Sequence, residues 1–297
     1  ATNLEEEMAN IRDAVETYSH VAAEVLLPKV VAEPMGPFGD YSEYNYQVLR
    51  CNIDLTRALQ ISLTLSDAKG NRPKGTSTWR FNFDYNPNRD FFLQETLDIL
   101  CHSCGVDLGK HHTQGINAQQ FGEQLMSSGM VLSEDVKWIA FCGASGLSEA
   151  PPRGGGAQGR TVEPPERRFY GMYSFGYLLQ LLTSQEMPDA IEGFVELMDL
   201  FFPSRCDLSE HVQQLPQLNG RDPADPQKRP FFCNAQHLLD GFFRLPEAVR
   251  RIAFDKTEEG ERPAALPFAP PKRQHRRRHH RDRDGEASGT KSAERGS

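Results

Sequence analysis

Two cysteines and two histidines that could bind a metal ion lie close together in the chain. Cys101 and Cys104 are separated by two residues, and Lys110 is followed by a pair of histidines ending at His112. Thiolates and imidazoles at such spacing are the ligands that zinc prefers. A strong zinc signature would also show a second properly spaced pair. The simpler interpretation is therefore the end of a helix with buried thiols, and zinc remains the alternative.

Two further groups could contact nucleic acid. Trp79, Phe81 and Phe83 alternate along the chain, which places three aromatic rings on one face of a strand. Such rings can stack on bases, but burial under a covering helix explains the alternation equally well, and we favour a role in the core. The basic run at 272–283 could act as a nuclear import signal, contact RNA, or be a solvated tail without a dedicated partner.

The charge of the chain is unevenly distributed. The 297 residues have a net charge of −8, with 38% hydrophobic and 25% charged residues, as is typical of a globular protein. Residues 266–297 carry nine Lys or Arg and four Asp or Glu, a net charge of +5, which leaves −13 for residues 1–265. An acidic body is not expected of a general nucleic-acid binder. No run of about 18 apolar residues occurs, so we expect no membrane contact.

The periodicity of the apolar residues predicts the elements that must position these groups. Phe175, Leu178, Leu179 and Leu182 form the stripe of a helix that packs on a core. The same reasoning predicts helices near 4–17, 44–52, 91–102, 118–127, 174–183, 189–201 and 236–251, and strands near 20–27, 59–66, 76–83, 136–142 and 205–208. Strands that first form a meander and then alternate with helices predict an α/β fold with a mixed sheet covered by helices.

The helix stripe also carries a resemblance to a known family. Residues 173–184 read Tyr-Ser-Phe-Gly-Tyr-Leu-Leu-Gln-Leu-Leu-Thr-Ser, which closely resembles Tyr-Asp-Phe-Gly-Tyr-Leu-Leu-Lys-Leu-Leu-Thr-Ser of the Caf/Pop-type poly(A)-specific ribonucleases, the catalytic subunits of the CCR–NOT deadenylase complex. Further matches are Tyr44-Asn-Tyr-Gln, Leu49-Arg-Cys-Asn, Ser77-Thr-Trp, Phe81-Asn-Phe and Val131-Leu-Ser. The resemblance implies a ribonuclease H-like exonuclease fold of the DEDD superfamily.

The same resemblance implies a site with two Mg²⁺ or Mn²⁺ ions, held by four acids that this chain has mostly lost. The two acids of the family's first strand fall on Glu24 and Leu26, and the third falls on Ser174. The best match for the fourth is Gln236, and the family's histidine falls on Phe231. Only Glu24 can carry a negative charge, and hard Mg²⁺ needs several anionic oxygens. We therefore expect no tightly bound metal ion.

Other residues near the site could compensate. Asp240 lies one helical turn after Gln236 and could replace a lost ligand, although Asp240, Glu33 and Asp207 are simplest to interpret as solvated acids. Lys29 replaces a family glycine and could contact phosphate, or simply point into solvent. None of these residues restores the family's set.

Two segments lie outside the expected fold. Residues 143–170 form a Gly-, Pro- and Arg-rich insertion at the turn that would bring Ser174 to the metal ions. Residues 255–297 form a Pro-, Arg- and His-rich tail that we expect to be disordered. The domain itself is expected to span residues 1–254.

These observations predict a CCR–NOT deadenylase-like subunit in mRNA turnover that has lost most of its nuclease activity and acts by binding. The expected partners are the NOT scaffold, other CCR–NOT subunits and poly(A) RNA. The alternatives are an active 3′–5′ exoribonuclease with rearranged ligands and a paralogue that works outside mRNA decay. Six scattered cysteines suggest reduced thiols, so we expect a cytoplasmic and nuclear protein.

Overall fold

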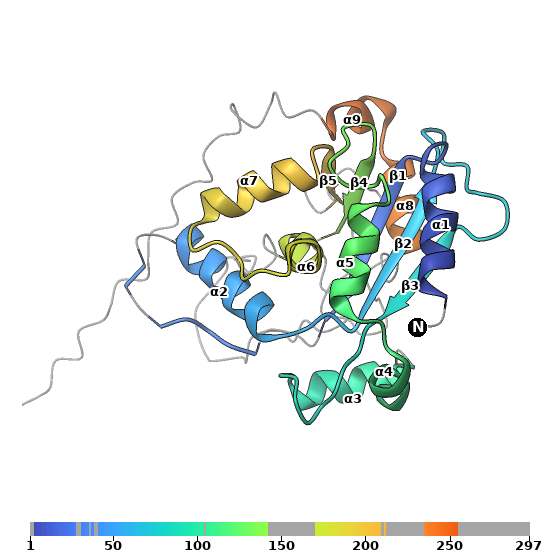
Figure 1. Ribbon diagram of the computed structural model, residues 1–297. Helices are drawn as coiled ribbons and strands as arrows, with labels where there is room; N and C mark the ends of the chain where they lie inside the picture. Colours follow the sequence, from blue (N-terminus) through green and yellow to red (C-terminus); the bar gives the residue numbers. More distant parts are fainter. Residues whose placement is uncertain are drawn as a thin grey trace, which may run out of the picture. The chain divides into compact units, whose positions relative to one another are not determined.

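A mixed five-stranded sheet lies at the centre of the described chain. The computed structural model describes residues 3–27, 31–35, 37–38, 41–103, 105–141, 170–208, 211 and 235–254. The sheet has the order β3-β2-β1-β4-β5 (Figure 1). β1 pairs antiparallel with β2 and β2 with β3, whereas β1–β4 and β4–β5 are parallel. The predicted meander followed by crossover strands is confirmed.

The elements follow the predicted order with small shifts at their ends. The strands are β1 His20–Leu26, β2 Gln60–Ser66, β3 Thr78–Asn82, β4 Lys137–Ala140 and β5 Arg205–Asp207. The helices are α1 Leu4–Val15, α2 Tyr41–Leu55, α3 Gln94–Ser103, α4 Leu108–Gln114, α5 Ala118–Met126, α6 Tyr170–Thr183, α7 Ile191–Phe201, α8 Ala235–Arg244 and α9 Glu247–Ile252.

Two predicted helix assignments were wrong. The sequence pattern predicted no helix at α4, because this short segment of glycine, histidine and polar residues lacks an apolar stripe. The helix is instead capped by Asp107, whose side chain accepts a hydrogen bond from the backbone N–H of Lys110. The single helix predicted at 236–251 is divided into α8 and α9. The break occurs at Pro246, which has extended backbone angles (φ −52°, ψ 143°) at the N-cap of α9.

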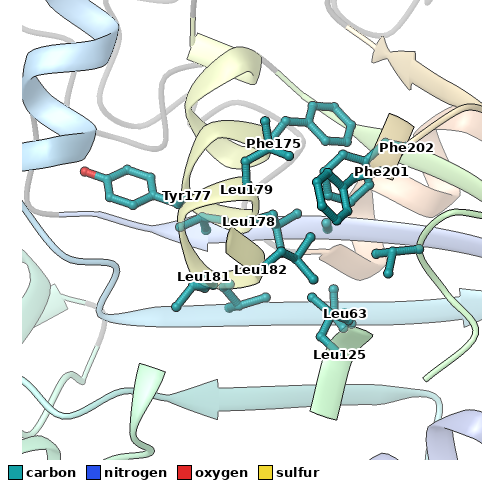
Figure 2. Packing of buried hydrophobic residues seen from close by; sticks show 14 of the residues in the cluster. Leu63, Leu125, Phe175, Tyr177, Leu178, Leu179, Leu181, Leu182, Phe201 and Phe202 are labelled. Carbon is teal, nitrogen blue, oxygen red and sulfur yellow. The ribbon is translucent and has the colours of Figure 1, made fainter. Parts of the chain in front are cut away.

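The main core lies on one face of the sheet. Alternate residues of the strands, such as Val21, Leu63 and Phe81, contribute to a single cluster together with α1, α5 and α6. In Figure 2, Phe175 and Leu178 project from α6 toward Phe201 and Phe202, with Leu63 and Leu125 on the side of Leu182. The predicted helix stripe is therefore confirmed.

The opposite face of the sheet is covered in part by α8. Ala22 of β1, Ile139 of β4 and Leu238 of α8 belong to a second apolar cluster. Figure 1 shows α1 and α5 in front of the sheet and α8 behind it. All of the described residues belong to one compact unit. No helix among them is long and apolar enough to cross a membrane.

Candidate functional site

The four positions that correspond to the family's acids lie on three elements that meet at β1. Glu24 and Leu26 are on β1, Ser174 is in the second turn of α6, and Gln236 is in the first turn of α8. Both helices contact β1. The fold therefore retains the framework on which such a site would be built, and the side chains decide what it can bind.

Glu24 is the one acid that remains, and it is largely buried. Burial raises the pKa of Glu24 to about 7, with a smaller opposing effect of the Arg80 guanidinium. The strand register places Glu24 beside Ser62 of β2, and Ser62 beside Arg80 of β3. In the described part of the chain, the Glu24 carboxylate has neither a hydrogen bond nor an ion pair. A carboxylate in this position gains a proton near neutral pH.

Leu26 cannot take part in metal binding. Its side chain packs against a third apolar cluster of Leu59, Tyr85, Leu97 and Leu100. Its backbone carbonyl accepts a hydrogen bond from the N–H of Leu59 at 2.9 Å. The hydrocarbon side chain thus has a structural role at the end of β1.

Ser174 is a neutral residue in a helix that is apolar on nearly all sides. It is only 8% exposed. Tyr177, one turn further along α6, points away from the Leu178 and Leu182 side in Figure 2, and its hydroxyl hydrogen-bonds to Thr56, which directly follows α2. A serine hydroxyl is a weak ligand for Mg²⁺ compared with a carboxylate.

Gln236 makes a contact that draws it toward β3. Its side-chain amide donates to the hydroxyl of Thr78 at 2.9 Å. Arg72, on the turn between β2 and β3, donates to the carboxylate of Asp240 at 2.5 Å and to the backbone carbonyl of Gln236 at 3.4 Å. The proposed substitute ligand Asp240 is therefore already paired with a guanidinium.

The described residues contain no group of three His, Cys, Asp or Glu side chains that could hold a metal ion. This finding is limited to that part of the chain, and Lys29, Phe231 and most of the predicted insertion lie outside it. Asp207 ends β5 and Glu33 is exposed. The donor set that the structure shows does not fit a site for two dications.

The predicted cysteine and histidine group is only partly described. Cys104 lies outside the described residues, so the zinc alternative remains untested. Burial raises the pKa of the Cys101 thiol, which favours the protonated form. His111 is buried, and its Nδ1 hydrogen-bonds to the carbonyl of Phe83 at 2.9 Å. The aromatic residues Trp79, Phe81 and Phe83 are all buried, which confirms their predicted place in the core.

Comparison with known proteins identifies the framework. No protein-family model matches the chain. The "Probable CCR4-associated factor 1 homolog 7" of Arabidopsis thaliana is 34% identical over 224 residues, covering 73% of this chain and 71% of that protein. The chain belongs to the CCR4-associated factor 1/Pop2 family. The poly(A) ribonuclease pop2 of Schizosaccharomyces pombe is 35% identical over 208 residues, which is 70% of this chain but only 53% of pop2.

Solved structures of CCR4-associated factor 1/Pop2 proteins share the fold. The Mg²⁺- and Mn²⁺-bound form of S. pombe Pop2p aligns with a TM-score of 0.66 and 29% identity, over 87% of this chain and 94% of that chain. Yeast CAF1 in complex with the NOT1 MIF4G domain aligns with a TM-score of 0.57 and 26% identity, over 82% and 84%. The RNase domain of yeast Pop2 also matches, with a TM-score of 0.59. The predicted α/β, ribonuclease H-like fold is confirmed.

Two features of the site were not recognised in the sequence. Arg72 fixes the start of α8 to the β2–β3 turn, a contact between residues 168 positions apart that leaves no local signal. Arg80 shares a row of the sheet with Glu24. The position of Arg80 could have been predicted from the sequence. Since Trp79 and Phe81 point to the core face of β3, Arg80 between them must point to the opposite face.

Proposed function

We propose that this protein is a CCR–NOT deadenylase-like subunit that acts in mRNA turnover by binding and has lost most or all of its nuclease activity. The observation that carries this proposal is the replacement of three of the four family acids by Leu26, Ser174 and Gln236. Each of the three has a neutral side chain, and Leu26 and Gln236 make contacts that suit their neutral character.

The chemistry of the family explains why this loss matters. Two-metal nucleases hold their ions roughly 3.5–4 Å apart, and the ions stabilise both the attacking and the leaving oxygen of a phosphodiester. Two such charges need several anionic oxygens around them. Glu24 alone offers one carboxylate, and it is partly protonated at neutral pH. We therefore propose that Mg²⁺ and Mn²⁺ do not bind tightly at this site.

The active-enzyme alternative requires substitute acids. Asp240 is the nearest candidate in sequence, but its carboxylate is paired with Arg72. A titration with Mn²⁺ followed by electron paramagnetic resonance separates the two functions. We expect no Mn²⁺ to bind at micromolar concentrations. Binding of two Mn²⁺ ions per chain, lost in Glu24→Gln, would support the active enzyme instead.

Exposed apolar side chains on the described chain offer a surface for a protein partner. Leu132 is 50% exposed and Leu200 is 56% exposed. They lie close together, because the backbone N–H of Leu132 donates to the carbonyl of Phe201 at 2.9 Å. Met126, at the end of α5, and Val195 of α7 are also exposed. We name the surface formed by Leu132 and Leu200 the α5–α7 patch.

We propose that the α5–α7 patch binds a NOT1 MIF4G domain, the partner with which the related yeast CAF1 was crystallised. A partner that covers these two exposed leucine side chains removes their apolar surface from water, which favours binding. This partnership, with poly(A) RNA as a second ligand, is our proposal for the role of the chain. We also propose that it acts in the cytoplasm and the nucleus.

Co-purification with a NOT1 MIF4G domain tests the binding role. We expect the full chain to bind, and Leu132→Glu with Leu200→Glu to abolish binding by placing charge in the interface. Ile252→Glu is the matched control, since Ile252 is similarly exposed (48%) but lies on α9. Binding that survives the double substitution, or that Ile252→Glu equally abolishes, would overturn the assignment of the patch.

A further inference from the structure

A row of polar side chains crosses the sheet on the face opposite the main core. Strand pairing places Glu24, Ser62 and Arg80 side by side on β1, β2 and β3. Directly paired residues of neighbouring strands point to the same face, and the strands lie about 4.8 Å apart. The guanidinium of Arg80 and the carboxylate of Glu24 are therefore separated by one small serine.

The neighbouring rows are polar as well. On one side, the amide of Gln60 donates to the side-chain carbonyl of Asn82 at 2.7 Å, which leaves the NH₂ group of Asn82 as a donor. On the other side, Thr64 and Thr78 share a hydrogen bond of 2.9 Å. We name these three rows, from Gln60–Asn82 to Thr64–Thr78 with Arg80 between them, the polar platform.

Helix α8 covers only one end of the polar platform. Gln236 bonds to Thr78 and so closes the Thr64–Thr78 row. Arg80 and Asn82, by contrast, are exposed. Within the described residues, Arg80 forms no ion pair and no hydrogen bond. An exposed guanidinium without a partner, next to a free amide donor, is suited to an anionic group with several oxygens.

The balance of charge decides which anion can approach. A site with four carboxylates repels phosphate until two dications neutralise it. In this row Glu24 is the single acid and Arg80 the single cation, so the row carries no net negative charge even without a metal ion. Arg80 lies on the face that carries the family's first-strand positions, Glu24 and Leu26.

We propose that Arg80 and the polar platform form a metal-independent binding site for a phosphate group of single-stranded nucleic acid. Arg80 holds two phosphate oxygens with its forked donors, and Asn82 donates to a third. The nucleic acid is bound and not cleaved, because the described residues hold no group of acids that would bind a metal ion and activate water. This inference rests on the proposed function, which makes the chain a binding subunit, and it names the contact through which RNA is held.

The test measures binding of AMP and adenosine to the full chain in the presence of EDTA. AMP carries the phosphate and adenosine does not. We therefore expect AMP to bind at least roughly tenfold more tightly than adenosine, because charge-assisted hydrogen bonds to the phosphate contribute about that much binding free energy. Arg80→Gln should weaken AMP binding by roughly the same factor and leave adenosine binding unchanged, and Arg80→Lys should have an intermediate effect. Folding of each variant is checked by circular dichroism.

Arg251→Gln serves as the matched control, because Arg251 is 77% exposed on α9 and outside the platform. We expect it to bind AMP like the unaltered chain. A labelled oligo(A) should lose affinity in Arg80→Gln as AMP does, while the basic run at 272–283 contributes equally to both proteins. Equal binding of AMP and adenosine, or no effect of Arg80→Gln, would overturn the phosphate site. Binding to the NOT1 MIF4G domain would then still stand as a separate test of the proposed function.

Discussion

The two faces of the β1–β2–β3 sheet differ sharply in what they contain. One face presents Val21, Val25, Leu63 and Phe81 to α1, α5 and α6, and each of these residues is at most 3% exposed. The other face presents the row Glu24, Ser62 and Arg80 and is only partly covered by α8. The first face builds the fold, whereas the second carries Glu24 and Leu26, the positions that the resemblance matches to the family's first-strand acids.

The contrast shows that a fold and its chemistry can be separated within single strands. Along β1, β2 and β3, residues alternate between an apolar face that is fully packed and a second face that keeps Glu24 but has Leu26 at the position matched to the family's other first-strand acid. We propose that the family's activity depends on the second face, so membership of the family does not by itself establish activity.

The largest difference between the faces should appear in stability. Leu63→Ala removes a fully buried side chain from the main core and should lower the free energy of unfolding by about 3–5 kcal/mol. Ser62→Ala, one residue earlier and on the polar face, should change it by less than about 1 kcal/mol. Chemical denaturation of both variants measures this. Similar losses would show that the polar face is packed as tightly as the core.

Glu24 should make stability depend on pH near neutrality. Its folded-state pKa of about 7 lies above the ordinary value of 4.5, so the folded chain retains a proton that the unfolded chain has released. Stability is therefore lost as the pH rises from about 4.5 through 7. Glu24→Gln should stabilise the protein at pH 8 by an amount on the order of 3 kcal/mol, and have no effect below pH 4.

Denaturation of the unaltered chain and of Glu24→Gln across pH 4–8 measures this difference directly. All other titratable groups are the same in the two proteins. The difference between their free energies of unfolding therefore reports the titration of Glu24 alone. A pH-independent difference would mean that the carboxylate is well solvated or paired.

His20, at the other end of β1, should make the free energy of unfolding depend on pH in the opposite direction to Glu24. The size of its contribution should be similar to that of Glu24 or smaller. Burial lowers the pKa of His20 to about 4, with a further contribution from Lys137, and the ring lies among Phe242, Phe243 and Phe254. The unfolded chain binds a proton below about pH 6.5 that the folded chain rejects, so stability is lost as the pH falls from 6.5 through 4.

Substitution of His20 by leucine should remove the loss of stability that comes from protonation of this histidine in the unfolded chain. The variant should therefore lose less stability than the unaltered chain between pH 7 and 4. Thermal unfolding at a series of pH values measures the difference. An unchanged acid sensitivity in His20→Leu would assign it to other groups.

The smallest effect concerns the contact between α8 and the β2–β3 turn. Arg72 and Asp240 are about one-third and one-half exposed, so solvent screens their attraction. Asp240→Asn should cost less than about 1 kcal/mol. A double-mutant cycle with Arg72→Gln isolates the pair. A coupling of several kcal/mol would show that this pair, and not the apolar cluster beneath α8, fixes the helix.

The sequence predicted the fold where local patterns are strong. The stripe of α6 and the alternation of Trp79 and Phe81 are repeated apolar positions, and both led to buried residues. Helix α4 was missed because its residues form no such stripe, and the break at Pro246 was overlooked because the apolar pattern continues across it.

For the candidate site, motif comparison supplied the positions and their altered residues, but not their surroundings. The pairing of Gln236 with Thr78, and of Arg72 with Asp240, joins residues more than 150 positions apart. Such contacts follow from how α8 packs on the sheet. No short stretch of sequence contains them.

Cleavage of labelled oligo(A) is the decisive experiment for an intact framework whose nuclease chemistry is lost. The purified full chain is incubated with Mg²⁺ or Mn²⁺ beside a variant carrying Glu24→Asp, Leu26→Glu, Ser174→Asp and Gln236→Asp. We expect the unaltered chain to leave oligo(A) intact, whereas the variant should shorten it stepwise in a metal-dependent manner. Stepwise shortening by the unaltered chain, abolished by EDTA, would show that the protein is an active nuclease.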